Sequence, residues 1–354
     1  MRHAFDGVPL RTLVLGLIGA CTLSTMMSTE VVMAGEQART VCVGHFLLDV
    51  PKDASVRATG SYRAVTVEKL GSTDDFEEIE TEARRKAASL EGQKTERNPD
   101  DDDFDRGFGI DPTTTFSATR LVGVDVDPSR QQTVVGRHVA NGSAAIEVVL
   151  TRLLAGAKYA FSVQGGGADK YSAIRESLAR TVDRYTPLRP NEIPTQPGFC
   201  VGDGVFQEDG PQDVGGDATL IVHFSQHPNV TFSVDVAGLM QPSEEPSLEG
   251  RISGDLGMLA RFSSQVKTLQ RGKVLYAGQD GYEIAISAPS EGMDGTRMQK
   301  FFFGAEGIPR DARHPFMEVQ LMTGETGPSP LTDEQAKVLW QELMGSLRLR
   351  PGSM

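Results

Sequence analysis

Few residues in this sequence have the types and spacing that catalysis or metal binding requires. Its 354 residues contain no Gly-x-Ser-x-Gly nucleophile elbow, no Walker phosphate loop and no His-Glu-x-x-His zinc motif. His223 and His227 are four positions apart, but they flank a predicted strand end and turn. That spacing aligns metal ligands on a helix, not on a strand. The sequence therefore argues against an enzyme and predicts neither a metal nor another cofactor.

Acidic residues form two groups that could contact a basic protein partner. One group is a charge run with an aromatic residue inside it, and the other belongs to the glycine-rich stretch from Asp203 to Asp217. A calcium loop would need alternating acids, a glycine and a closing Glu, which the charge run lacks. The run is either a solvated loop or a surface that steers a partner by its charge. The candidate partner-binding residues are Asp100, Asp101, Asp102, Asp103, Phe104, Asp105, Asp203, Glu208 and Asp209.

Two cysteines, Cys42 and Cys200, lie outside the N-terminal segment that we expect to be removed. Each stands at the head of a predicted strand, in the same tripeptide Cys-Val-Gly. In an oxidising compartment such a pair can form a disulfide that links two domains at equivalent positions. Alternatively, both are small buried apolar side chains. A bond needs Cα atoms about 4.4–6.8 Å apart, and the sequence does not specify that distance.

The first 34 residues have the pattern of an export signal. Arg2, His3 and Arg11 precede a short apolar run, which is too short to cross a bilayer core of about 20 helical residues. Small residues at Val32 and Ala34 suit cleavage before Gly35, whereas the run that ends at Cys21 resembles a bacterial lipobox. The second interpretation makes Cys21 a lipidated N-terminus. In a bacterium, either one places the chain in the periplasm, free or membrane-anchored as a lipoprotein.

Composition narrows the remaining function classes. With 35 Lys+Arg and 48 Asp+Glu, the formal net charge is −13 at pH 7. This charge disfavours broad binding to nucleic acid or to anionic lipid, because both carry phosphates. Hydrophobic residues make up 39% and charged residues 23%, as in an ordinary globular protein.

Outside its N-terminal segment, the sequence contains two copies of one repeated unit. Both copies begin with Cys-Val-Gly, at Cys42 and Cys200, and both end with Leu-Arg-Pro, at Pro190 and Pro351. These markers are 148 positions apart in the first copy and 151 in the second. We therefore predict a signal peptide at 1–34, tandem domains at 41–190 and 198–352, and a proline-rich linker at 191–197.

Each predicted domain is α+β, a mostly antiparallel sheet with about two helices. Thr332 and Gln335 form the sequence pattern of a helix capping box just before the second Leu-Arg-Pro. Apolar residues at helical spacing predict three further helices, at 74–90, near 169–182 and at 257–269. The predicted strands are 41–50, 63–69, 116–126, 133–140, 144–153, 158–163, 218–224, 230–236, 274–277, 282–287, 298–303 and 316–322.

Scattered motifs along the chain resemble one known family. They are the segment Cys42–Pro51, the segment Pro197–Gly204, Gly-Gln-Asp-Gly-Tyr-Glu from Gly278, Leu-Met-Thr-Gly from Leu321, and the ending Ser346–Pro351. Together they resemble the two-domain immunity proteins of type VI secretion phospholipase effectors, those that guard against the class-four lipase effector.

The resemblance implies a non-enzymatic periplasmic inhibitor that grips the effector with both domains and keeps lipid from its active site. It implies no contact residues, because partner-facing surfaces diverge within the family. Such a grip needs about 1,200–2,000 Å² of buried surface around apolar anchors. Phe104 and Met240 are candidate anchors, although each also suits ordinary surface or core.

Two other function classes remain open from the sequence. One is a periplasmic binding or envelope-assembly lipoprotein with no toxin partner, which a neighbouring lipase gene would count against. The other is an enzyme with an unfamiliar site, which a purified protein without hydrolase activity would weaken.

Overall fold

The computed structural model describes residues 38–91, 121–138, 145–210, 213–242, 249–250, 265–290, 296–324 and 327–354. This part of the chain is mostly strand, with three α-helices: α1 (Phe76–Glu91), α3 (Tyr171–Val182) and α5 (Asp333–Ser346). No described helix has the length and apolar character needed to span a lipid bilayer. Cys21 and the acidic run with Phe104 lie outside the described residues.

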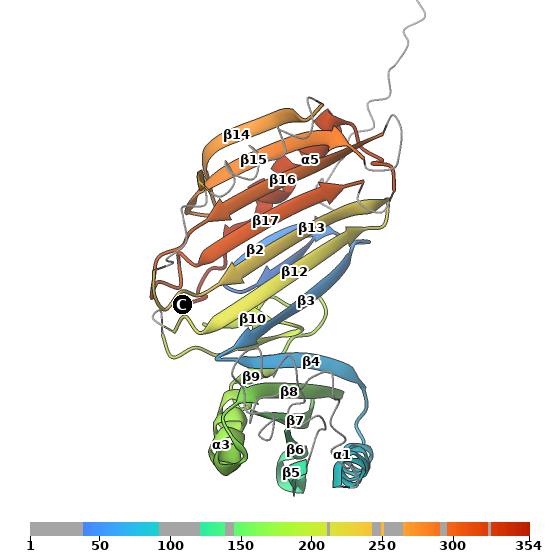
Figure 1. Cartoon of the computed structure of the whole chain (residues 1–354), viewed down its shortest axis with the longest axis vertical. Coiled ribbons are helices and arrows are strands. Elements are labelled where there is room, and N and C mark those ends of the chain that lie inside the picture. Colours follow the sequence, from blue (N-terminus) through green and yellow to red (C-terminus); the bar gives the residue numbers. More distant parts are fainter. Residues whose placement is uncertain are drawn as a thin grey trace, which may run out of the picture. The chain divides into compact units, whose positions relative to one another are not determined.

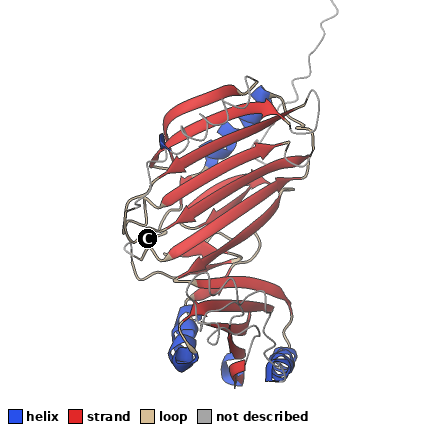
Figure 2. Cartoon of the chain, viewed as in Figure 1, coloured by secondary structure: helices blue, strands red, loops and turns tan. Residues whose placement is uncertain are grey.

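Twelve antiparallel strands form one large sheet (Figures 1 and 2). Its order is β14-β15-β16-β17-β13-β12-β3-β4-β8-β7-β6-β5. In chain order, the strands are β3 (Ser55–Tyr62), β4 (Val65–Ser72), β5 (Leu121–Asp127), β6 (Gln132–His138), β7 (Ile146–Leu154), β8 (Ala157–Gly165), β12 (Gly216–Phe224), β13 (His227–Ala237), β14 (Lys267–Tyr276), β15 (Gln279–Pro289), β16 (Arg297–Ala305) and β17 (Phe316–Thr323).

The large sheet contains the same strand order twice. In the N-terminal half of the chain, up to Pro190, the order is β3-β4-β8-β7-β6-β5. In the C-terminal half, from Gly198, the order is β12-β13-β17-β16-β15-β14. The first strands of the two halves, β3 and β12, join them through antiparallel pairs that run from Ser55 with His223 to Tyr62 with Gly216. The prediction of large antiparallel sheets with few helices is confirmed.

Two small sheets combine strands from both halves. β1 (Ala38–Val43) and β2 (Phe46–Pro51) pair with β18 (Arg348–Leu349), the last strand of the chain. β10 (Phe199–Val201) and β11 (Gly204–Phe206) pair with β9 (Tyr185–Pro187), the last strand of the N-terminal half. The predicted linker at 191–197 therefore does not separate two sets of strands that pair only among themselves.

The helices cover the sheet where the apolar periodicity places them. α5 begins with the predicted capping box, in which the Thr332 hydroxyl accepts from the Gln335 amide at 3.2 Å. Its Trp340 is buried against Phe301 and Phe232, with ring centroids 5.6 and 6.2 Å away. α1 buries Ile79, Ala83, Ala87 and Leu90 and packs on the end of the N-terminal half of the sheet.

Several element boundaries differ from the sequence prediction. The strand predicted at 41–50 is a hairpin, because Gly44 turns the chain with a φ of +55° that glycine adopts without strain. Strand β3 was not predicted. Within the helix predicted at 257–269, the described residues from Lys267 onward belong to strand β14 instead. A strand there satisfies its backbone groups against β15.

Candidate partner-binding site

The two hairpins that open the halves meet at a disulfide. The sulfur atoms of Cys42 and Cys200 are joined at 1.97 Å, and their Cα atoms are 5.9 Å apart. Beside the bond, Gly44 and Cys200 exchange two backbone hydrogen bonds of 2.9 Å each. The glycine turn therefore brings β1–β2 against β10, where the Asp203–Asp217 stretch begins.

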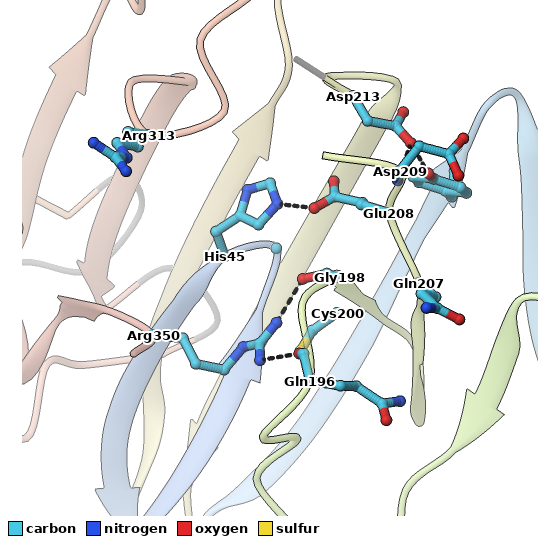
Figure 3. A network of polar contacts seen from close by, with 12 residues as sticks. His45, Gln196, Gly198, Cys200, Gln207, Glu208, Asp209, Asp213, Arg313 and Arg350 are labelled. Carbon is cyan, nitrogen blue, oxygen red and sulfur yellow. Dashed lines mark hydrogen bonds and ion pairs between the residues drawn. The ribbon is translucent and has the colours of Figure 1, made fainter. Parts of the chain in front are cut away.

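Glu208 is buried, whereas the predicted contact with a partner needs a position on the surface. The residue is 7% exposed, and its Oε2 is 2.8 Å from Nε2 of His45 (Figure 3). Burial raises the pKa of the Glu208 carboxyl, and the hydrogen bond with His45 only partly offsets that rise. In the structure, Phe206 and Glu208 point inward while Gln207 and Asp209 point outward, with the alternation of extended chain. The sequence did not show this, because residues 207–209 are all polar.

The negative charges of Asp209 and Asp213 are paired with arginine side chains of the same chain. The Asp209 side chain is 64% exposed, but it contacts the guanidinium groups of Arg63 at 3.0 Å and of Arg184. Asp213 accepts hydrogen bonds from Tyr62 at 2.5 Å and from Arg63 at 2.7 Å. Burial raises the pKa of Asp213, but these hydrogen bonds outweigh it and the net shift is downward. Much of the acidic stretch therefore holds the junction between the halves together.

Arg350 is a central residue of this junction, although its sequence context marks it only as part of the repeated Leu-Arg-Pro. It is 1% exposed, and it donates to the backbone carbonyl of Pro194 at 2.9 Å. It also donates to those of Gln196 at 2.8 Å and Gly198 at 2.5 Å (Figure 3). No carboxylate among the described residues forms an ion pair with it, and burial lowers its pKa. The burial of a cation in carbonyl oxygens has no signature in local sequence.

Asp203 is the predicted acid that stays available to a partner. It lies in the turn between β10 and β11, its side chain is 55% exposed, and its nearest cation is Lys69 at 3.6 Å. Asp203 and Asp217 lie at a cleft of about 910 Å³ formed by β3, β4, β6, β7, β8 and α1. Small hydroxyl side chains line the cleft: Thr59, Thr66, Thr133, Thr151 and Ser162.

A second surface carries exposed apolar side chains. Leu275 and Ile308 line a shallow cavity of about 750 Å³, and they are 64% and 51% exposed. Met240 is 58% exposed, as a surface anchor would be. Large exposed apolar side chains of this kind are the residues that desolvate when a protein partner binds.

The described residues contain no group suited to metal binding. His223 and His227 lie on the paired strands β12 and β13 near their connecting turn. No three His, Cys, Asp or Glu residues in the described part of the chain come together as metal ligands.

Solved structures with the same fold include two of one immunity protein and one of a Tle4–Tli4 complex. The apo immunity protein TplEi of the type VI secretion system of Pseudomonas aeruginosa aligns over 89% of this chain and 97% of its own, with 19% identity and a TM-score of 0.69. TplEi complexed with "L" peptide covers 90% and 100%, with 19% identity and a TM-score of 0.65. A Tle4–Tli4 complex covers 90% and 99%, with 19% identity and a TM-score of 0.70.

Sequence comparison finds one family model, which matches the C-terminal half of the chain. No curated protein sequence matches the chain. Residues 192–352, however, match the family model described as the Tle cognate immunity protein 4 C-terminal domain. The resemblance to immunity proteins of type VI secretion lipase effectors is thereby confirmed. Residues 192–352 are thus similar to the Tle cognate immunity protein 4 family, a family of immunity proteins and not of enzymes.

Proposed function

We propose that this chain is a periplasmic immunity protein that binds a cognate type VI secretion phospholipase effector with both halves and blocks lipid access to it. The observation that carries the proposal is the match of residues 192–352 to the immunity-protein family. The fold supports it, because the similarity to the Tle4–Tli4 complex extends over 90% of this chain and therefore over both halves.

We propose further that the chain is a tandem duplication, with domains at 41–190 and 198–352 and a linker at 191–197. The repeated Cys-Val-Gly and Leu-Arg-Pro markers and the repeated strand order support this. Because β3 and β12 join the two sets of strands, a partner can meet both halves on one continuous surface.

The cleft beside Asp203 is the surface that we propose for the effector. It adjoins the junction of the halves, it is open, and Leu70 at its side is 44% exposed. Asp203 supplies exposed negative charge there. The acidic run Asp100, Asp101, Asp102, Asp103, Phe104 and Asp105 joins this proposal as a further contact for a basic surface.

Export follows from the N-terminal segment. We propose that the chain reaches the periplasm either after cleavage before Gly35 or as a lipoprotein anchored through Cys21. Metabolic labelling with a fatty acid distinguishes the two, because Cys21→Ala removes the label only if Cys21 is the acylated residue.

The deciding experiment mixes the mature protein, residues 35–354, with the lipase effector encoded beside its gene and reads phospholipase activity in the same tube. We expect tight binding and loss of activity. A folded effector that neither binds nor loses activity would reject the function for this pair. The envelope-assembly lipoprotein would then be the stronger candidate.

A further inference from the structure

The two halves of the chain exchange their opening hairpins. β2 of the N-terminal half pairs with β18 at the end of the C-terminal half, with Leu47 opposite Arg348. β11 of the C-terminal half pairs with β9 at the end of the N-terminal half, with Phe206 opposite Tyr185. The exchange is reciprocal, so each small sheet forms only from strands of both halves.

The exchanged hairpins also carry core residues. Phe206 of β11 is fully buried, and its ring centroid lies 4.9 Å from those of both Tyr62 and Tyr185 in the N-terminal half. In the other direction, Phe46 and Leu48 of β2 are fully buried, and β2 packs against α5 of the C-terminal half. Removing either half would expose apolar core of the other.

Arg350 lies where the β1–β2 hairpin passes the segment that leads into the β10–β11 hairpin, and it contacts both. Its guanidinium holds three carbonyls of the segment that leads into β10, as described above. Its backbone amide donates to the carbonyl of His45 at 2.8 Å, in the turn of the other hairpin. The amide of Gly198 donates to the carbonyl of Ser353 at 2.9 Å. Arg350 thus holds the segment that leads into β10 against the end of β18 and reaches the first hairpin through its backbone amide, and Gly198 ties the same segment to Ser353.

The repeat supplies a natural comparison for Arg350. Arg189 occupies the same place in the first Leu-Arg-Pro, but its side chain is 87% exposed and pairs with the neighbouring Glu192 at 3.1 Å. The two arginines share their local sequence and differ in what surrounds them. The contacts of Arg350 therefore arise from the crossing and not from the repeated unit itself.

We propose that the reciprocal exchange of hairpins fixes the two halves in one arrangement before the effector binds. We propose also that Arg350 is the positioning residue, or latch, that holds the exchanged segments in place where they cross. Its consequence for effector binding rests on the proposed function, since a grip by two halves is stronger when their arrangement is fixed in advance. The planar guanidinium reaches three carbonyls at once, and a lysine ammonium lacks that fixed fork.

The test cleaves the segment between β9 and β10 at a position that leaves the hydrogen bonds of Arg350 intact. A protease site is inserted between Asn191 and Glu192 of the mature chain, with Cys42 and Cys200 replaced by Ala, and the halves are followed by size exclusion after cleavage. We expect the cut halves to stay together. The cut leaves Arg350 and its three carbonyls on the C-terminal fragment, where they hold the lead into the β10–β11 hairpin against β18. Because β11 and β18 both pair with the N-terminal fragment, we expect Arg350→Met to speed the separation about tenfold, whereas Arg189→Met leaves it unchanged. If Arg350→Met does not fold, Arg350→Lys is measured instead and is expected to separate faster than the parent.

Each result decides a part of the proposal. Cut parent halves that separate into folded monomers would overturn the exchange. Equal separation for the Arg350 and Arg189 variants, or parental behaviour of Arg350→Lys, would overturn the latch.

A second arm measures affinity for the effector with uncut proteins, where we expect Arg350→Lys to bind about tenfold more weakly than Arg189→Lys. Matching affinities would reject the positioning role. If the parent protein does not bind the effector, the proposed function fails while the cleavage arm still tests the exchange.

Discussion

The carboxylate of Glu208 is hydrogen-bonded to the ring of His45 at 2.8 Å, although 163 positions separate the two residues. His45 lies in the turn of the first hairpin, and Glu208 directly follows the second. The second carboxylate oxygen, Oε1, has no partner among the described residues. This polar contact therefore lies where the two exchanged hairpins meet, and its cost depends on whether the carboxyl is charged.

The pH dependence of folding stability should reveal the burial of Glu208. Because the folded-state pKa of Glu208 is raised above 4.5, its contribution to stability is present below that value and is lost as pH rises through the folded pKa. We expect the free energy of unfolding of the parent to fall relative to Glu208→Gln as pH rises from below 4.5 toward neutrality. Denaturant titrations of both proteins across this range measure the difference. A difference that grew in favour of the parent with rising pH would contradict the assignment.

Asp213 should show the opposite sign. Its pKa is lowered below 3.8, so its stabilisation is present above 3.8 and is lost as pH falls through the folded pKa. Its side chain is 9% exposed, so we expect Asp213→Asn to cost about 1–3 kcal/mol at pH 7 and less near pH 3. Asp209→Asn is the matched control, because that exposed side chain should contribute far less. Equal losses for the two variants would show that the hydrogen bonds to Tyr62 and Arg63 do not stabilise the junction.

Local sequence patterns predicted many of the helices and strands of this fold. They did not predict that the two halves exchange their opening hairpins. The capping box at Thr332 and the apolar stripe through Trp340 give helix α5 directly, because both signals lie within a few residues. The repeated Cys-Val-Gly and Leu-Arg-Pro markers located two copies of one strand order. Neither marker says which half a hairpin pairs with, because Leu47 pairs with Arg348 near the far end of the chain, whereas Phe206 pairs with Tyr185 just across the predicted linker.

The candidate site shows the same division between local and distant causes. The exposed position of Asp203 followed from a turn between two short strands. The burial of Glu208 was not readable from the sequence, because residues 207–209 are all polar and only the structure shows which of them points inward. Arg350 and Arg189 have the same neighbours in sequence and opposite exposures, so only the tertiary structure separates their roles.

The disulfide should contribute strongly to stability, because Cys42 and Cys200 are 158 positions apart and the bond closes a long loop. We expect replacement of both cysteines by Ala to lower the free energy of unfolding by about 2–5 kcal/mol. Denaturant unfolding of the oxidised parent and the double variant gives this difference, and the reduced parent should match the variant. An oxidised parent no more stable than its reduced form would argue that the bond contributes nothing.

The cleft can be tested as the effector surface by placing a bulky cation on its floor. Thr151 is partly exposed there and projects from β7, so Thr151→Arg should fold while filling space that a partner would occupy. We expect at least about tenfold weaker binding to the lipase effector, because an unpaired charge is desolvated in the interface. Val338→Arg is the control, since Val338 is 43% exposed on α5 and does not line the cleft. Calorimetry with both variants compares them directly. Loss of binding for Val338→Arg alone would move the interface from the cleft to the face that α5 covers.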